Sequence, residues 1–164
     1  MKNLIFFSMA VILFCGCGQN KTSSEPPQAQ QSLSAGQDNN YIKEGVAYLN
    51  KGDVASAIHN FNKAIVQNPR DAKPYMILAE VYMRLQNYKN AIENLNHVVV
   101  LEPDNGPAYY FLGICYGLNG NKKEAIKSLE RSVFIFQQIK DEENFKKAVT
   151  ILQQMTESQT ADQN

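Results

Sequence analysis

Residues 72–105 read AKPYMILAEVYMRLQNYKNAIENLNHVVVLEPDN, and the stretches on either side repeat their pattern of residue types. Residues of one kind recur at a spacing of 34 positions. The matching sets are Tyr41, Tyr75 and Tyr109; Gly45, Ala79 and Gly113; Tyr48, Tyr82 and Tyr116; Ala57, Ala91 and Ala125; and Phe61, Leu95 and Leu129. Pro69 and Pro103 close the first two stretches, and Gln137 stands where a third proline would fall. A fixed period of this length indicates stacked supersecondary units.

Each unit predicts two helices joined by a tight turn. In the second unit Tyr75, Leu78, Ala79 and Tyr82 follow the i, i+3, i+4, i+7 spacing of an apolar helix face. The run then breaks, and a residue able to cap a second helix follows the break. The breaks are Gly52, Gln86 and Gly120, and the expected caps are Asp53, Asn87 and Asn121. Small residues in the Gly45 and Ala57 sets are expected to let the two helix backbones approach closely.

This pattern resembles the tetratricopeptide repeat, a helix–turn–helix unit of the same length, over about 100 of the 164 residues. The resemblance implies an all-α fold, an α-α superhelix of three repeats at 38–71, 72–105 and 106–139. Residues 140–156 predict a C-terminal capping helix and 157–164 a disordered tail.

An N-cap and an apolar stripe support the final helix. Asp141 can cap it, and Phe145, Ala148 and Leu152 share one apolar face. A plain cap is the favoured interpretation and a dimerisation helix the alternative, so the sequence leaves the oligomeric state open.

The N-terminus has the pattern of a bacterial lipoprotein. Residues 1–16 predict a signal peptide, in which Leu4 to Phe14 form an apolar run of eleven residues. A bilayer span needs about 20. The stretch Leu13 to Cys17 resembles a lipobox, which implies cleavage before Cys17 and lipid on its sulfur; an ordinary secreted protein is the alternative. Residues 17–37 are then the lipidated cysteine and a flexible tether, which reaches roughly 25 Å. The expected location is extracytoplasmic, anchored to the membrane by lipid (the periplasmic side of the outer membrane in a Gram-negative source).

Composition argues against nucleic-acid binding and catalysis. Lys plus Arg and Asp plus Glu number 16 each and are interspersed, so no basic block would attract nucleic acid. His59 and His97 have no ligand-spaced neighbours, which predicts no metal. Cys115 falls in an apolar column and is expected to be a packed side chain. No phosphate loop, serine elbow or paired carboxylate is present, so neither enzyme activity nor a cofactor is expected.

The resemblance also places the first helix of each unit along a concave groove. Relatives that grip a peptide carboxylate use Lys, Asn and Arg there, whereas this chain has residues such as Ile42, Val46, Ile77 and Phe111. The trough therefore predicts an apolar partner segment. In the alternative, these side chains belong to the inter-helix core or the tether fills the trough. The predicted groove residues are Ile42, Val46, Leu49, Lys73, Met76, Ile77, Glu80, Met83, Arg84, Tyr110, Phe111, Ile114 and Leu118.

The second-helix faces, which carry His59, Lys63, Lys127 and Arg131, are expected to be a solvated exterior. Together these patterns predict a membrane-anchored adaptor that binds a protein or peptide, without catalysis. A role in assembling an envelope machine such as type IV pili is expected by analogy of layout. The alternatives are an adaptor for cell-wall hydrolases or proteases and a lipoprotein enzyme with an unrecognised site.

Overall fold

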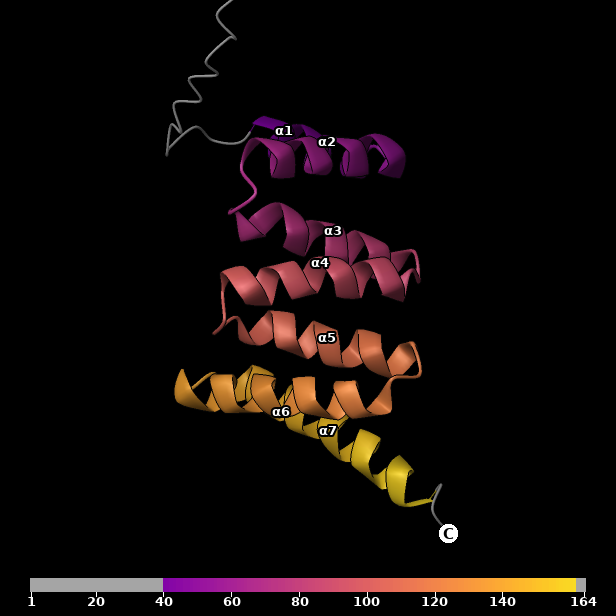
Figure 1. Ribbon diagram of the computed structural model, residues 1–164, viewed down its shortest axis with the longest axis vertical. Coiled ribbons are helices and arrows are strands. Elements are labelled where there is room, and N and C mark those ends of the chain that lie inside the picture. Colours follow the sequence, from indigo (N-terminus) through magenta and orange to yellow (C-terminus); the bar gives the residue numbers. More distant parts are fainter. Residues whose placement is uncertain (1–39, 162–164) are drawn as a thin grey trace, which may run out of the picture. The chain divides into compact units, whose positions relative to one another are not determined.

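The structure is a computed structural model that describes residues 40–161, with side chains to Glu157. The predicted signal peptide at 1–16, the lipidated cysteine and tether at 17–37, and the last three residues lie outside this range. The described chain is entirely helix and turn, and its seven helices are α1 (Asn40–Asn50), α2 (Val54–Gln67), α3 (Ala72–Arg84), α4 (Tyr88–Leu101), α5 (Gly106–Leu118), α6 (Lys122–Gln138) and α7 (Glu142–Ala161). They follow one another in chain order from α1 at the top of Figure 1 to α7 at the bottom. The predicted fold of three helical hairpins plus a C-terminal helix is confirmed.

Each hairpin turns at a residue in the left-handed backbone region. Gly52, Gln86 and Gly120 have φ values of 78°, 57° and 83°, respectively. Glycine suits this region because it has no Cβ, so Gln86 is the strained member of the set. The next residue is the N-cap of the second helix, as predicted.

Two of the three expected side-chain caps are formed. The Ser56 amide donates to Asp53 at 3.0 Å, and the Asn90 amide donates to Asn87 at 3.2 Å. Asn121 occupies the predicted N-cap position of α6, but its side chain makes no cap hydrogen bond, so the predicted side-chain cap is wrong there. Its turn is closed by the same backbone hydrogen bond as the other two, in which the Asn121 amide donates to the Tyr116 carbonyl at 2.8 Å.

Within a hairpin, the two helices touch where the sequence places its smallest residues. A Cβ added at Gly45 would lie 2.6 Å from Phe61, and one added at Gly113 would lie 2.5 Å from Leu129. Both distances are far below an ordinary carbon–carbon contact of about 3.5–4.0 Å. The expected close approach is therefore confirmed.

Between hairpins, α2 packs on α3 and α4 packs on α5, which joins the units into one stack. One cluster of buried residues surrounds Phe61 and Leu78, and a second surrounds Leu95 and Leu112. Each cluster draws side chains from two successive units, so no hairpin buries its apolar face alone.

The third unit departs from the first two at the end of its second helix. Helices α2 and α4 have 14 residues each, and Pro69 and Pro103 follow two positions after their ends. With Gln137 in place of a proline, α6 runs on to 17 residues. This agrees with the rule that proline and the residue before it disfavour helix.

Helix α7 begins as predicted and ends later. The Asn144 amide donates to Asp141 at 3.1 Å, which confirms the cap. The helix continues to Ala161, five residues beyond the expected end at 156, so the predicted tail is helical in its first part. Ala148 is fully buried, and Met155 occupies the space that a side chain at Gly117 of α5 would need. Helix α7 thus covers the exposed side of the third unit.

No helix within residues 40–161 combines the length and apolar character needed to cross a bilayer.

Candidate partner-binding surface

The predicted groove residues come from the first helices of the three units. Helix α1 carries Ile42, Val46 and Leu49; helix α3 carries Lys73, Met76, Ile77, Glu80, Met83 and Arg84; helix α5 carries Tyr110, Phe111, Ile114 and Leu118.

The prediction that Ile42 belongs to this surface is wrong. Ile42 is 7% exposed and lies in the core cluster with Phe61 and Leu78, so it cannot contact a partner. The residues one and two units later in the same column are Met76 and Tyr110, which are only half-buried. A short branched side chain remains beside the core, whereas long side chains at the same position reach past it.

The remaining apolar members divide between core and surface. Leu49 and Ile77 pack against the first core cluster, and Met76, Met83 and Phe111 pack against the second. All five are nevertheless only half-buried. A half-buried apolar side chain is held by the core on one side and offers its other side to a ligand.

Other members project outward. Val46 is 39% exposed and Leu118 is 58% exposed. Lys73, Glu80 and Arg84 are exposed along α3, and their side chains make no hydrogen bond or ion pair within residues 40–157. The Tyr110 and Phe111 rings contact each other with centroids 5.7 Å apart. The first helices therefore combine apolar and aromatic contact area with three unpaired charges on α3.

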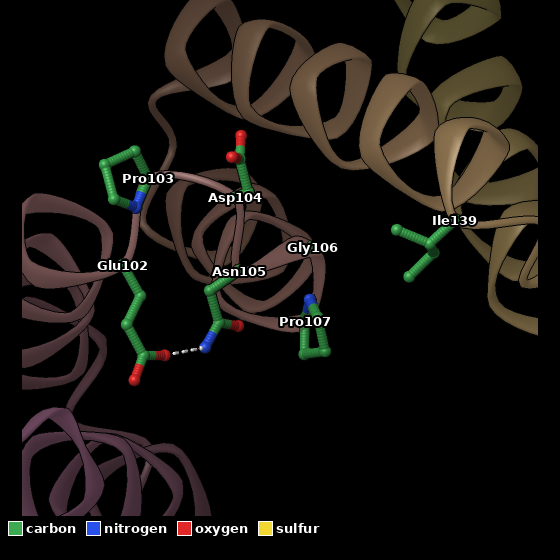
Figure 2. A pocket seen from close by; sticks show the side chains of 7 residues that line it. All are labelled: Glu102, Pro103, Asp104, Asn105, Gly106, Pro107 and Ile139. Carbon is green, nitrogen blue, oxygen red and sulfur yellow. Dashed lines mark hydrogen bonds between the residues drawn. The ribbon is translucent and has the colours of Figure 1, made fainter.

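Two surface hollows lie elsewhere. The larger, of about 500 Å³, is formed by the turn between α4 and α5 and the end of α6, and Figure 2 shows Ile139 facing this turn. There the Asn105 amide group donates to the Glu102 carboxylate at 2.6 Å. Its lining is Glu102, Pro103, Asp104, Asn105, Gly106, Pro107 and Ile139.

The smaller hollow, of about 330 Å³, lies over α3 between α2 and α4. Its lining is Asn62, Ile65, Tyr75, Tyr82, Asn90, Glu93, Asn94 and His97. None of the thirteen predicted groove residues lines either hollow.

A row of aromatic contacts at one edge was not predicted. In each unit the first-helix tyrosine is covered by a side chain of the second helix. Lys63 lies over Tyr41 at 5.5 Å from the ring centroid, and the His97 ring stacks on Tyr75 with centroids 4.8 Å apart. Arg131 lies over Tyr109 at 5.8 Å. The covering residues stand 34 positions apart, so the signal was present in the repeat. Cation–π and stacking contacts of this kind fix the second helix against the first.

The cysteine of α5 is a core residue. Cys115 is fully buried, and burial raises the pKa of its thiol to about 11. A thiol in this state stays protonated near neutral pH and is a poor nucleophile. The prediction that Cys115 is a packed side chain is confirmed. No group of three or more His, Cys, Asp or Glu side chains in the described part of the chain could hold a metal ion.

Stacked antiparallel helix pairs of one fixed length define an α-helical repeat protein. The family model of the tetratricopeptide repeat matches residues 42–99 and 78–138, and the chain belongs to that family. No curated protein sequence matches it.

Three solved structures illustrate the shared fold. The first TPR domain of Spaghetti (RPAP3), bound to the HSP90 peptide SRMEEVD, is 22% identical with a TM-score of 0.64, covering 74% of this chain and 91% of that one. The TPR2B domain of yeast Sti1, in a complex with pHsp70, is 18% identical with a TM-score of 0.65, covering 73% and 95%. The type III secretion translocator chaperone SycD of Yersinia enterocolitica is 14% identical with a TM-score of 0.67, covering 74% and 84%. At these identities the likeness concerns the fold alone.

Proposed function

We propose that this protein is a membrane-anchored adaptor that binds a protein or peptide through the first-helix surface of its repeats. The observation that carries the proposal is the row of half-buried apolar side chains on successive first helices, above all Met76 and Met83 of α3 and Phe111 and Ile114 of α5. Two similar folds are named in complexes, one with an HSP90 peptide and one with pHsp70, which supports an adaptor role over a catalytic one.

The surface favours an apolar partner segment. Methionine side chains adapt their shape to different ligands, and aromatic rings supply large contact areas. The peptide SRMEEVD bound by the Spaghetti domain carries three acidic residues. Here Ile77 and Phe111 stand where the resemblance implies charged clamp residues. An amphipathic helix or an extended apolar segment therefore fits better. The charged side chains of Lys73, Glu80 and Arg84 would then orient the bound segment.

Anchoring is the second half of the proposal. It rests on the apolar run ending at Phe14, on the lipobox-like stretch ending at Cys17 and on the polar composition of residues 18–37. A lipid on Cys17 with a tether of this length would keep the repeats near the membrane while they engage a partner. Assembly of an envelope machine such as a type IV pilus is the task that this layout fits.

The binding surface is tested by a double substitution. We expect Met76→Glu with Ile114→Glu to abolish capture of partners cross-linked in the protein's own cells and identified by mass spectrometry. The helical circular dichroism should persist, because both side chains are only half-buried. The matched control is Asn62→Glu with Asn96→Glu, which adds the same charges at exposed positions of the second helices α2 and α4. The control variant should still capture the partner. If capture also survives the first-helix pair, the surface is not the site.

The anchor is tested separately. Cys17→Ala should move the protein from the membrane fraction to the aqueous fraction of lysed cells. Retention of this variant on membranes would contradict the lipobox interpretation.

A further inference from the structure

Three apolar side chains of the second helices are exposed at one repeat position. Val66 of α2 is 84% exposed, Val100 of α4 is 77% exposed and Phe134 of α6 is 50% exposed. They stand 34 residues apart, near the C-terminal ends of their helices. Ile139, just after α6, is 62% exposed. We call these four residues the apolar edge. Single exposed apolar residues are ordinary on a surface, but a column repeated in every unit needs an explanation.

The apolar edge lies beside the aromatic and basic contacts described above. Val66 is one helical turn beyond Lys63, which covers Tyr41, and Val100 is one turn beyond His97, which covers Tyr75. Arg131 joins the two features directly, since its guanidinium lies over both Tyr109 and Phe134, at 5.5 Å from the Phe134 ring.

Exposed apolar tips backed by tyrosines and long basic side chains are typical of protein surfaces at the boundary between lipid headgroups and acyl chains. Lysine and arginine can extend toward the headgroups while the apolar tips enter the boundary. Arg131 is also paired with Asp104 at 2.9 Å, which lowers the net charge of the edge. Contact with a bilayer would then depend on apolar burial more than on anionic lipid.

The chain enters the array at this same edge. Helix α1 begins at Asn40, next to Tyr41, and Tyr41 lies under Lys63. Helix α1 thus begins at a residue whose neighbour, Tyr41, contacts Lys63, one helical turn before Val66. The turns joining α2 to α3 and α4 to α5 lie on one side of the array, on the left in Figure 1.

We propose that the apolar edge rests on the membrane surface, with the C-terminal ends of α2, α4 and α6 toward the lipid. The proposal rests on the proposed lipid anchor, which supplies the nearby membrane. A tether of about 20 residues reaches roughly 25 Å, which is enough for contact and short enough to keep the edge close to the bilayer. In this orientation the first-helix surface points along the membrane and stays open to a partner.

The test compares two labels on one helix. The lipidated chain, carrying either Val100→Cys or Lys89→Cys, is labelled with an environment-sensitive fluorophore and bound to vesicles of neutral phosphatidylcholine and phosphatidylethanolamine. Residue 89 is exposed near the other end of α4, eleven residues and about 16 Å away. The native Cys115 is fully buried, so the label goes to the introduced cysteine.

We expect the emission of the label at residue 100 to rise several-fold, shift to the blue and be quenched by nitroxide-bearing lipids. The label at residue 89 should remain as in water. Identical, water-like emission from both labels on vesicle-bound protein overturns the proposal. So does an emission change at residue 100 that appears with protein concentration in the absence of vesicles, because a second copy would then cover the edge.

A second arm separates the edge from the anchor. A chain that begins at residue 17, with Cys17→Ala and an N-terminal hexahistidine tag, is held on the same vesicles by a nickel-chelating lipid, and flotation of the lipidated chain is measured in parallel. If the lipidated chain fails to float, the proposed lipid anchor is refuted. An emission change at residue 100 in the tagged arm would still support contact between the apolar edge and the bilayer. If the lipidated chain floats and the emission at residue 100 is water-like in both arms, the lipid anchor stands and the proposed contact between the apolar edge and the bilayer is refuted.

Discussion

Replacing Gly113 by alanine should destabilise the third repeat through a clash that can be estimated from the structure. The added Cβ would lie 2.5 Å from Leu129 Cγ, 2.9 Å from Leu129 Cδ2 and 3.2 Å from the Ala125 carbonyl oxygen. An ordinary carbon contact needs about 3.5–4.0 Å, so the overlap with Leu129 is about 1 Å. Leu129 is fully buried and the carbonyl belongs to a helix, so neither can move aside without shifting α6 against α5.

The net magnitude combines two opposing effects. Overpacking of a close-packed core costs about 1–3 kcal/mol. Alanine is the better helix former by about 0.8–1 kcal/mol, which offsets part of that cost. Because a rigid branched side chain and a backbone atom both obstruct the new Cβ, we expect a net loss of about 1–2 kcal/mol and a melting temperature lower by about 3–8 °C.

The assay is urea and thermal unfolding of the full chain followed by far-ultraviolet circular dichroism. Gly117→Ala is the matched control on the same helix, since the close contacts of its new Cβ would be with the flexible end of Met155, and Ala125 Cβ lies at an ordinary contact distance of 3.8 Å. We expect the control to be neutral or slightly stabilising. In a Leu129→Ala background Gly113→Ala should also be neutral, because the obstruction is gone.

The second repeat shows which result would refute this reasoning. It has Ala79 in the Gly113 column and Leu95 in the Leu129 column, and both are fully buried. If Gly113→Ala were as stable as the unaltered chain, the helices of the third repeat could separate to accommodate alanine as those of the second do. Glycine at position 113 would then allow the close approach of α5 and α6, but the fold would not require that approach.

Three further outcomes are expected. Gln86→Gly should stabilise the chain by about 1 kcal/mol, because glycine adopts the φ of 57° at this turn without strain, and Gly120→Ala should have the opposite effect on the urea midpoint. In a chain with Cys15→Ala and Cys17→Ala, Cys115 should react with Ellman's reagent at pH 8 only after unfolding, since burial raises its pKa to about 11; prompt reaction of the native form of this variant would contradict this. The pKa of Asp141 is lowered by hydrogen bonds from the side chain and then the backbone of Asn144. Its contribution to stability should therefore be complete above its ordinary pKa of about 3.9 and be lost as the pH falls through the lower value of the folded chain, a dependence that Asp141→Ala should reduce in acid unfolding curves.

The repeat period predicted the fold because burial and backbone chemistry recur with it. Tyr75, Gly113 and Pro103 each perform a task that every unit of the stack must solve: filling space, admitting a neighbour or ending a helix. Such demands appear in the sequence as columns. Asn121 could not be judged in this way, since a residue able to cap a helix does not have to do so.

Surface positions were less predictable, because the position of a residue within the repeat does not alone decide whether its side chain is exposed. Ile42 shares its column with Met76 and Tyr110, yet its side chain is too short to leave the core. The column of Val66 was not singled out from the sequence. The second-helix faces were expected to be solvated, and the structure shows that an apolar side chain is exposed at the same place in each unit.

The extended α6 limits how this array can lengthen during evolution. Three additional residues displace the next helix by about 4.5 Å along the axis of α6 and turn its starting point by about 300°. A duplicated 34-residue segment inserted between the first and second units, or between the second and third, would meet neighbours in the expected register. The same segment added after the third would not. Gene duplications in this lineage should therefore be found at internal junctions, with α6 and α7 inherited together as the terminal piece.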